Sequence, residues 1–357
     1  MSPDPSQASE TSLRKDAHLD LCATGDVAPV ENSTLLECVK LLHCAMPELA
    51  VSQVSLATRL FGKTLAAPLL ITGMTGGTER AGQVNRDLAR AAEEAGVAFG
   101  VGSQRAMAEN PSLVKSFAVR DVAPTTVVIG NIGLRQAAAM GLDALRRMTD
   151  SIGADALALH LNPGQELTQP EGDRDFQGGY EVVTQLVRAY GDRLMVKETG
   201  CGLSAAVVRR LVDCGVRTID VSGLGGTSWV RVEQLRATGV AAEVGAAFAS
   251  WGIPTAAAVA AARQISGPGV TLIASGGLRT GLDVARAIAL GADLGGMALP
   301  LFRAQQEGGA SGVKVALQTI LTTLRHALVL TGSKDLKEFQ QKPKVVVGEL
   351  KDWLRGS

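Results

Sequence analysis

The residues best suited to chemistry lie between positions 160 and 166, which read His-Leu-Asn-Pro-Gly-Gln-Glu. His160, Asn162, Gln165 and Glu166 bring hydrogen-bond donors, acceptors and one carboxylate into a short segment. Alternation along a strand at 156–161 places His160 on the same side as Ala158, and Asn162 follows on that side. A histidine satisfied in the core would explain His160 alone, but it leaves the rest of the cluster without a reason. We therefore expect this segment to face a polar site.

A phosphate-binding pattern occupies positions 272–283, which read LIASGGLRTGLD. Gly276 and Gly277 allow backbone N–H groups to face an anion, and a helix after Thr280 would present its partly positive end to the same anion. A pair of glycines can also simply end a strand. Arg279 and a second glycine pair at 295–296 favour the phosphate site.

The other candidate positions are individually weak. Lys197 lies within an apolar segment, where an ammonium group is costly unless it meets an anion. Small and polar residues end further apolar segments, in TGMTGG at 72–77, GVGSQR at 100–105, GNIG at 130–133 and DVSGLGGTSW at 220–229. A basic cluster of Arg14, Lys15 and His18 would by default be an exposed surface.

A regular scaffold must position these residues. Short apolar segments occur at 68–74, 98–101, 126–132, 156–161, 194–198, 218–222, 271–275 and 294–298. Segments with helical spacing lie between them at 83–95, 142–152, 180–190, 204–214, 255–264 and 282–290. This alternation predicts a parallel sheet covered by helices, and eight units favour a closed (β/α)₈ TIM barrel over about 68–300. A doubly wound nucleotide-binding fold is the alternative, but no G-x-G-x-x-G follows the first strand.

Regions outside the barrel are expected to be simpler. Residues 1–12 are predicted to be disordered, and residues 13–357 to form one domain with an N-terminal arm to about 65. An amphipathic stretch at 313–330 predicts a C-terminal helix packed on the barrel, and the charged tail at 334–351 predicts a solvated surface.

Composition excludes several classes of partner. The 357 residues carry 35 basic and 35 acidic side chains, so no net positive charge is available for nucleic acid or an anionic membrane. No run of about 18 apolar residues and no signal-peptide pattern is present. The five cysteines show no metal-ligand spacing, which predicts free thiols and a cytoplasmic protein.

Taken together, the motifs resemble the flavin-dependent type II isopentenyl diphosphate isomerase family. The resemblance runs from about 14 to 330 and rests on RKDAH at 14–18, ITGMTGG at 71–77, GVGSQRA at 100–106, HLNPGQE at 160–166, VKETGCG at 196–202, SGLGGTSW at 222–229 and SGGLRTGLDVARAIALGAD at 275–293. The last motif is shared with many FMN barrels. HLNPGQE and the basic N-terminal motif are more specific.

The resemblance implies an FMN cofactor across the barrel mouth and residues that hold it. The expected FMN-binding residues are Thr72, Gly73, Met74, Thr75, Ser103, Asn131, Lys197, Ser222, Thr227, Gly276, Gly277, Arg279, Met297 and Ala298. The expected residues for isopentenyl diphosphate are Arg14, Lys15, His18, Arg105, His160, Asn162 and Gln165, with Gln165 and His160 also catalytic. Glu166 is expected to bind Mg²⁺, an ion that suits a carboxylate and phosphate oxygens.

The implied reaction converts isopentenyl to dimethylallyl diphosphate in isoprenoid biosynthesis. It adds a proton to an unactivated alkene and removes one from the adjacent carbon. Because protonating such an alkene is difficult for a protein side chain, the reduced flavin would supply this chemistry. Either the flavin N5 or Gln165 transfers the proton, and Lys197 would balance the anionic edge of the flavin. NADPH or another reductant would reduce the flavin. The resemblance also implies a homo-oligomer, a tetramer or larger.

Three alternatives are less consistent with the residues present. An FMN-dependent hydroxy-acid oxidase requires a His and Arg pair after a late strand, whereas the corresponding loop reads SGLGGTSW. An inosinate dehydrogenase requires a nucleophilic cysteine on a glycine-rich loop, for which Cys201 is the candidate. A silent phosphate-binding barrel would leave the cluster at 160–166 unexplained.

Overall fold

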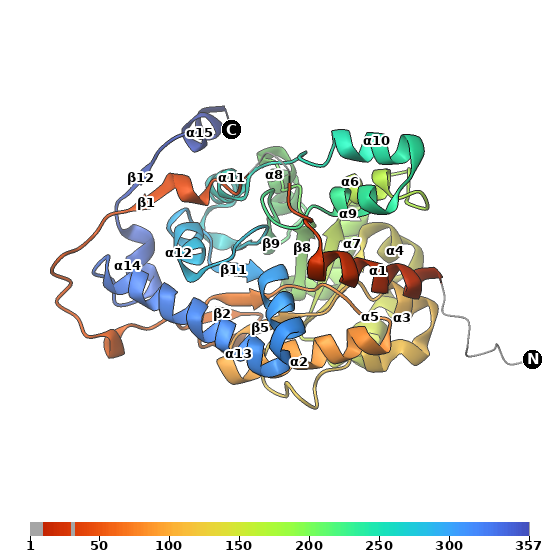
Figure 1. Cartoon of the computed structure of the whole chain (residues 1–357), viewed down its shortest axis with the longest axis horizontal. Coiled ribbons are helices and arrows are strands. Elements are labelled where there is room, and N and C mark those ends of the chain that lie inside the picture. The colour runs from red at the N-terminus through yellow and green to blue at the C-terminus, as the bar shows by residue number, and fades with distance from the viewer. Residues whose placement is uncertain (1–9, 30–32, 357) are drawn as a thin grey trace, which may run out of the picture.

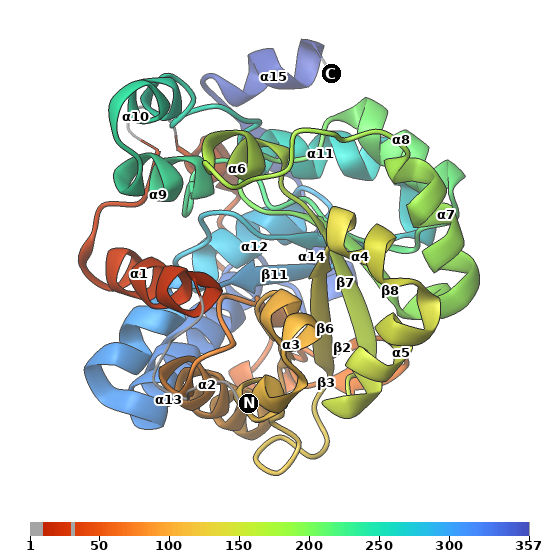
Figure 2. The ribbon, with the colours of Figure 1, turned by 90° about the vertical axis from the view of Figure 1, so that its right-hand side faces the viewer.

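A closed parallel barrel forms the centre of the molecule. The computed structural model describes residues 10–29 and 33–356, with side chains from Lys15 onwards. Within this part, eight strands pair in chain order and the last pairs with the first (Figures 1 and 2). They are β4 Leu69–Ile71, β5 Ala98–Gly100, β6 Val128–Gly133, β7 Ala156–Leu161, β8 Leu194–Glu198, β9 Thr218–Asp220, β10 Thr271–Ala274 and β11 Leu294–Met297. The predicted TIM barrel is confirmed.

Helices cover the outside of the barrel. Side chains along each strand alternate between the two faces of the sheet, so every second one points toward these helices. These helices are α2 Glu79–Ala95, α4 Leu134–Met140, α5 Leu142–Ser151, α7 Gly179–Tyr190, α8 Ala205–Asp213, α11 Thr255–Ser266, α12 Gly281–Ala289 and α13 Leu299–Val329. Each segment predicted as helical overlaps one of them and extends beyond it by at most one residue at either end. The C-terminal helix starts earlier than expected, and Gly309, at φ 56°, bends it.

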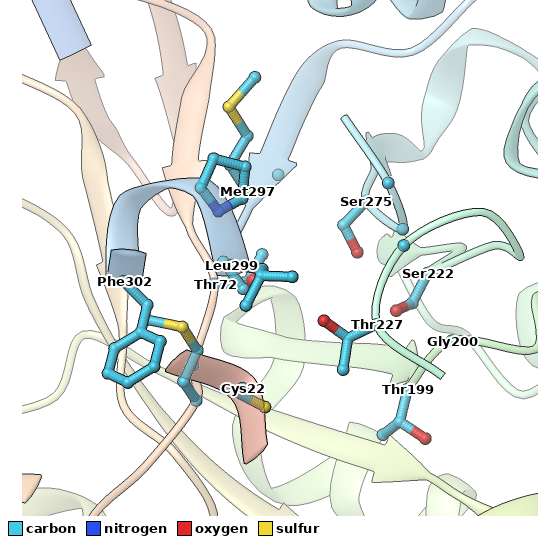
Figure 3. A pocket seen from close by; sticks show the side chains of 18 of the residues that line it. Cys22, Thr72, Thr199, Gly200, Ser222, Thr227, Ser275, Met297, Leu299 and Phe302 are labelled. Atoms are coloured by element: carbon cyan, nitrogen blue, oxygen red, sulfur yellow. The ribbon is translucent and has the colours of Figure 1, made fainter. Parts of the chain in front are cut away.

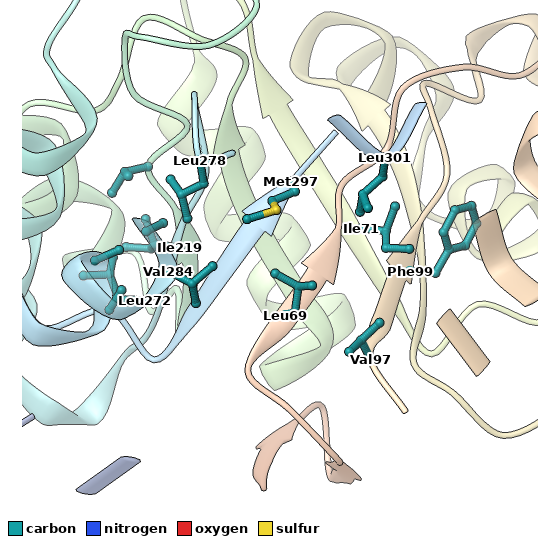
Figure 4. Packing of buried hydrophobic residues seen from close by; sticks show 14 of the residues in the cluster. Leu69, Ile71, Val97, Phe99, Ile219, Leu272, Leu278, Val284, Met297 and Leu301 are labelled. Carbon is teal, nitrogen blue, oxygen red and sulfur yellow. The ribbon is translucent and has the colours of Figure 1, made fainter. Parts of the chain in front are cut away.

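Two apolar layers stabilise the barrel. Outward-facing side chains such as Leu69, Ile71 and Phe99 pack against the helices (Figure 4). Inward-facing side chains such as Met195 form a separate inner cluster. The hairpin of β2 Thr58–Leu60 and β3 Lys63–Leu65 closes the amino-terminal end of the barrel, since its leucines join that inner cluster. The opposite, carboxyl end of the strands remains open as the mouth.

The N-terminal arm lies over the mouth. Helix α1 Glu10–Thr24 begins within the segment predicted to be disordered, of which residues 1–9 lie outside the described part. Figure 2 shows α1 between α9 Trp229–Arg236 and α13. Arg303 of α13 donates to the carbonyl oxygens of Cys22 and Gly25, and the Thr78 hydroxyl donates to Asp16. These bonds hold the arm against its own barrel.

The C-terminal tail is ordered, so the prediction of a purely solvated surface is wrong. Strand β12 Lys344–Val346 pairs antiparallel with β1 Val39–Leu41 of the arm. Helices α14 Leu336–Gln341 and α15 Leu350–Gly356 bury Phe339 and Leu350. The charged residues around these apolar positions concealed their contribution to the core.

Several short elements complete the fold. The loops at the mouth contain α3 Arg105–Glu109, α6 Pro163–Thr168, α9 and α10 Gly239–Ala247, none of which was predicted. The 3₁₀ turns are η1 Leu36–Cys38, η2 Val51–Gln53, η3 Pro111–Ser116, η4 Gly191–Arg193 and η5 Gly267–Gly269. Among the described residues, no helix has the length and apolar character needed to cross a bilayer.

Candidate active site

Two adjoining cavities open at the mouth of the barrel. The large cavity measures about 280 Å³ and the small cavity about 100 Å³. They share a wall formed by residues from five elements or loops, including Lys15, Met74, Lys197, Thr199 and Trp229. A molecule in one cavity would therefore contact a molecule in the other.

The large cavity collects most of the residues predicted to bind flavin. Thr72, Gly73, Met74, Thr75, Lys197, Ser222, Thr227, Gly276, Gly277, Arg279, Met297 and Ala298 all line it. Figure 3 shows Ser222, Thr227 and Ser275 on one side, with Met297, Leu299 and Phe302 facing them. Ser103 and Asn131 line the small cavity instead. The lining is apolar on one wall and polar on the other, as a flat ring with polar edges requires.

Two glycine-rich loops meet at one end of the large cavity. A Cβ on Gly226 would overlap the backbone nitrogen of Gly277, and a Cβ on Gly276 would overlap the carbonyl of Gly223. Gly276 and Gly277 have φ of 95° and 86°, which other residues rarely adopt. Only glycine permits this close approach, which gives a loop lined by backbone rather than by side chains.

A capped helix follows this turn directly. Helix α12 begins at Gly281, and the Thr280 hydroxyl accepts a hydrogen bond from the Asp283 amide while the Asp283 carboxylate accepts one from the Thr280 amide. This capping box fixes the first turn. Arg279 donates to the carbonyls of Gly277 and Gly225, at 3.0 and 3.1 Å, and so links the two glycine-rich loops.

A buried carboxylate organises the loop after β8. One oxygen of Glu198 accepts hydrogen bonds from the backbone amides of Thr199, Gly200, Cys201 and Gly202. Burial raises the pKa of Glu198 to about 7, against the opposing effect of these amides and Lys197. The side chain therefore shapes the wall shared by the two cavities without entering either one.

The small cavity collects the residues predicted to bind the diphosphate. Lys15, His18, Arg105, His160, Asn162, Gln165 and Glu166 all line it. The Arg14 side chain lies outside the described part of the structure. The lining includes four basic or imidazole groups together with several amide side chains, which suits a small anion.

His160 is fixed by its neighbour on β6. Its Nδ1 lies 2.8 Å from Oδ1 of Asn131, while Nδ2 of Asn131 donates to the carbonyl of Val101. Because the amide of Asn131 is oriented by Val101, its oxygen accepts the Nδ1–H of His160. Burial, Lys197 and Lys15 lower the pKa of His160 to about 3. The free protein thus holds a neutral imidazole with an unprotonated Nε2.

Helix α6 brings the remaining polar residues together. Nδ2 of Asn162 donates to Glu166 at 2.9 Å and lies 3.3 Å from the side-chain oxygen of Gln165. The other oxygen of Glu166 accepts the amide of Asp173 at 2.9 Å. No group of three or more metal-ligating side chains occurs among the residues that the structure describes. Glu166 could hold a metal only with ligands from a substrate or from water.

Glu233 of α9 was missed by the sequence reasoning. It is fully buried and accepts a hydrogen bond from Nε2 of Gln165 at 2.9 Å. His18 lies 3.1 Å from it, and Arg236 forms an ion pair with it. Burial alone would raise the pKa of Glu233, but His18, Gln165 and Arg236 hold it at about 2. Trp229 and Glu233 share a helix face, which is the signal that could have identified this residue.

Two rival activities find no support in the geometry. Cys201 is partly buried, and burial followed by the Glu198 charge raises its pKa to about 12. A thiol in that state is a poor nucleophile. The loop from Ser222 to Trp229 lines the large cavity with hydroxyl groups, glycines and an indole, without a His and Arg pair.

Comparisons with known proteins identify relatives of this chain. A family model described as FMN-dependent dehydrogenase matches residues 172–346. The chain is 43% identical to isopentenyl-diphosphate delta-isomerase of Ignicoccus hospitalis, over 96% of each chain. It is 45% identical to the enzyme of that name in Aeropyrum pernix, over 96% of this chain and 92% of the relative, and 41% identical to that of Nostoc sp..

Solved structures support the fold. Mandelate oxidase with (S)-2-phenylpropionate superposes with a TM-score of 0.63 at 19% identity, covering 95% of this chain and 99% of that one. Mandelate oxidase with 2-hydroxy-phenylacetamide gives a TM-score of 0.66 at 21% identity, covering 94% and 97%. Both are barrels of the same architecture. With relatives above 40% identity over nearly their full length, the chain belongs to the FMN-dependent type II isopentenyl-diphosphate delta-isomerase family.

Proposed function

We propose that the protein converts isopentenyl diphosphate to dimethylallyl diphosphate with reduced FMN. The observation that carries the proposal is the shared wall of the two cavities. One cavity has a backbone cradle for a phosphate and a flat lining, and the other has basic and amide groups for a second anion. A flavin and a small diphosphate could thus lie in contact, and family membership identifies the diphosphate as isopentenyl diphosphate.

The large cavity fits FMN by the chemistry of its lining. Backbone groups of Gly276 and Gly277 and the start of α12 would hold the phosphate, which is stabilised by the partly positive end of a helix. Met74 and Thr227 would contact the ring, and Lys197 would lie by its polar edge. When bound, reduced FMN supplies an acid–base group and electron density that stabilises a developing carbocation.

The small cavity would bind the diphosphate through Lys15, Arg105 and His160. These groups supply cations or proton-binding sites without a large basic surface, consistent with one small anion. Mg²⁺ would bind Glu166 and complete its coordination with diphosphate oxygens and water, as this ion commonly does. The ion would offset the charge that two phosphate groups bring into a partly buried site.

Gln165 would orient the reacting carbons. Glu233 accepts its amide protons, so its carbonyl oxygen faces Asn162 and the small cavity. Glu233 also holds His18, and it therefore connects the arm to the catalytic residue. His160 would accept a proton at Nε2 when the diphosphate arrives, because the anion favours imidazolium.

The isomerisation leaves the oxidation state of substrate and product unchanged, so electrons are needed only to reduce the flavin. NADPH or another two-electron reductant would meet that need. A homo-oligomer is supported by apolar side chains on and after α10, where Val240 is 75% and Trp251 64% exposed. Contiguous exposed apolar residues commonly mark protein interfaces.

The proposed function is tested by an anaerobic assay of FMN-loaded protein. We expect dimethylallyl diphosphate to form only when flavin is reduced and Mg²⁺ is present, with no net oxidation of the flavin. Oxidised flavin and a metal-free sample are the controls. Failure to bind FMN, or peroxide formation from a 2-hydroxy acid without any isomerisation, would overturn the proposal.

A further inference from the structure

Lys197 and Asp220 lie side by side inside the barrel. The register of β8 and β9 pairs them directly, and the register of β7 and β8 pairs His160 with Lys197. Lys197 is 8% exposed and Asp220 is fully buried. Residues in register on adjacent strands project to the same face, so the ammonium and the carboxylate face the barrel interior together.

Asp220 has one satisfied and one unsatisfied oxygen. Oδ1 accepts the hydroxyl of Ser275 at 2.7 Å and the amide of Ser222 at 3.2 Å. Oδ2 has no hydrogen-bond partner among the described residues. Both Asp220 and Lys197 line a space of about 10 Å³ inside the barrel, which is close to the volume that one water molecule needs.

The two groups depend on each other for charge. Burial lowers the pKa of Lys197, and the charges of Asp220 and Glu198 oppose that shift. Burial raises the pKa of Asp220, and Lys197 opposes that shift. Nζ of Lys197 donates to the backbone carbonyl of Glu198 at 2.6 Å, and the Glu198 carboxylate is held by the amides of its own loop. The imidazole of His160 is neutral, so Asp220 is the carboxylate that lines the same space as Lys197 inside the barrel. Neither charge is stable there without the other.

We propose that Asp220 is a positioning residue that keeps Lys197 protonated in the wall of the flavin cavity, through its charge across the space that both side chains line. This inference rests on the proposed function, since it gives Lys197 a role beside the flavin. Lys197 lines the flavin cavity, whereas Asp220 lines only the space beneath it. The nearer cation therefore dominates the field at the flavin, and Asp220 acts on the flavin through Lys197.

The midpoint potential of bound FMN tests the direction of this effect. Asp220→Asn keeps the shape of the side chain but removes its charge, so Lys197 should lose its proton and reduced flavin should lose its counter-ion. We expect reduced flavin to be stabilised about tenfold less relative to oxidised flavin, a negative shift of about 30 mV for two electrons. Lys197→Met should shift the potential in the same direction, and Asp213→Asn, on the exposed end of α8, should not. A positive shift in Asp220→Asn would show that Lys197 keeps its charge, and would overturn the proposal.

A double-mutant cycle on the apoprotein tests the pair without flavin or activity. Each single variant leaves the other side chain buried without its oppositely charged neighbour. Lys197→Met combined with Asp220→Asn removes both charges. We expect the double variant to lose less unfolding free energy than the sum of the single variants. Additive losses would overturn the proposal. A protein that fails the isomerase assay but shows this coupling would refute the proposed function and leave the coupling between Lys197 and Asp220 standing.

Discussion

At the scale of single residues, the tautomer of His160 is decided by Asn131. Nδ2 of Asn131 is engaged by the carbonyl of Val101, so its oxygen is available only to Nδ1 of His160. The unprotonated Nε2 therefore belongs to the small cavity, together with Lys15 and Arg105. Because this imidazole is neutral in the free protein, its Nε2 can take up a proton when an anion binds in the small cavity.

We expect binding of inorganic diphosphate or substrate to take up a proton at His160. The pKa of His160 is about 3 in the free protein, and a neighbouring diphosphate favours the imidazolium form and raises it. At a pH between the pKa of His160 in the free protein and its pKa in the complex, the complex holds about one more proton than its free components. Calorimetry in two buffers of different ionisation enthalpy measures this uptake. His160→Gln should abolish it, and equal uptake by that variant would assign the proton elsewhere.

Replacement of Glu166 tests the metal site. Glu166→Gln removes the carboxylate proposed to bind Mg²⁺ but keeps an acceptor for the amide of Asp173. We expect the Mg²⁺ concentration for half-maximal turnover to rise about tenfold to a hundredfold, with FMN content unchanged. Glu171→Gln, an exposed change on the same segment, is the matched control. An unchanged Mg²⁺ dependence would remove Glu166 as a ligand.

At the scale of elements, the flavin site is made by two loops that touch. The loop after β9 and the loop after β10 approach each other through glycines, and Arg279 bonds to both. The strands provide the frame and α12 provides the anion-binding end. Neither loop would form the cradle alone, because each limits where the other can lie.

Gly226→Ala should weaken FMN binding by separating these loops. Its Cβ would overlap the Gly277 backbone, and such overpacking commonly costs about 1–3 kcal/mol, which corresponds to about tenfold to hundredfold in the dissociation constant. Fluorescence titration of the apoprotein with FMN measures the effect. Gly269→Ala is the control, since that Cβ would meet nothing within 4 Å. Equal affinities in the two variants would contradict this account of the cradle.

The elements were predictable from sequence to different degrees. Buried parallel strands are continuous apolar runs, so all eight were located to within a few residues. Helices α3, α4, α6, α9 and α10 and the tail were missed, because short helices with mixed polarity carry weak periodic signals. Motif residues at strand ends could be assigned to the mouth, but Glu233 and the pairing of Asp220 with Lys197 depend on contacts between elements. The spacing of residues within one segment does not indicate which side chains from different elements will contact each other.

At the scale of the whole molecule, the tail is part of the core. Phe339 of α14 is 1% exposed, while Val345 of β12 is 44% exposed. Both lie far along the chain from the residues of the active site. The stability of the barrel and its chemistry should therefore respond separately to changes in this region.

Phe339→Ala should destabilise the protein without altering the site. Deleting a buried phenylalanine costs about 3–5 kcal/mol, and in a chain of this size that should lower the melting temperature by roughly 10 °C. Differential scanning calorimetry measures the shift, and kcat and KM at low temperature should be unchanged. Val345→Ala should have little effect. A loss of activity in the folded Phe339→Ala protein would connect the tail to the site.

The arm and the tail together determine when the native structure can form during synthesis. Elements before residue 72 find several of their partners near the other end of the chain, since β1 pairs with β12, β4 with β11, and α1 bonds to Arg303. Contacts so distant in sequence form slowly. On the ribosome, the segment made first must wait for the segment made last, with its apolar residues exposed. The period before release is thus when this chain is most exposed to aggregation and most in need of a chaperone.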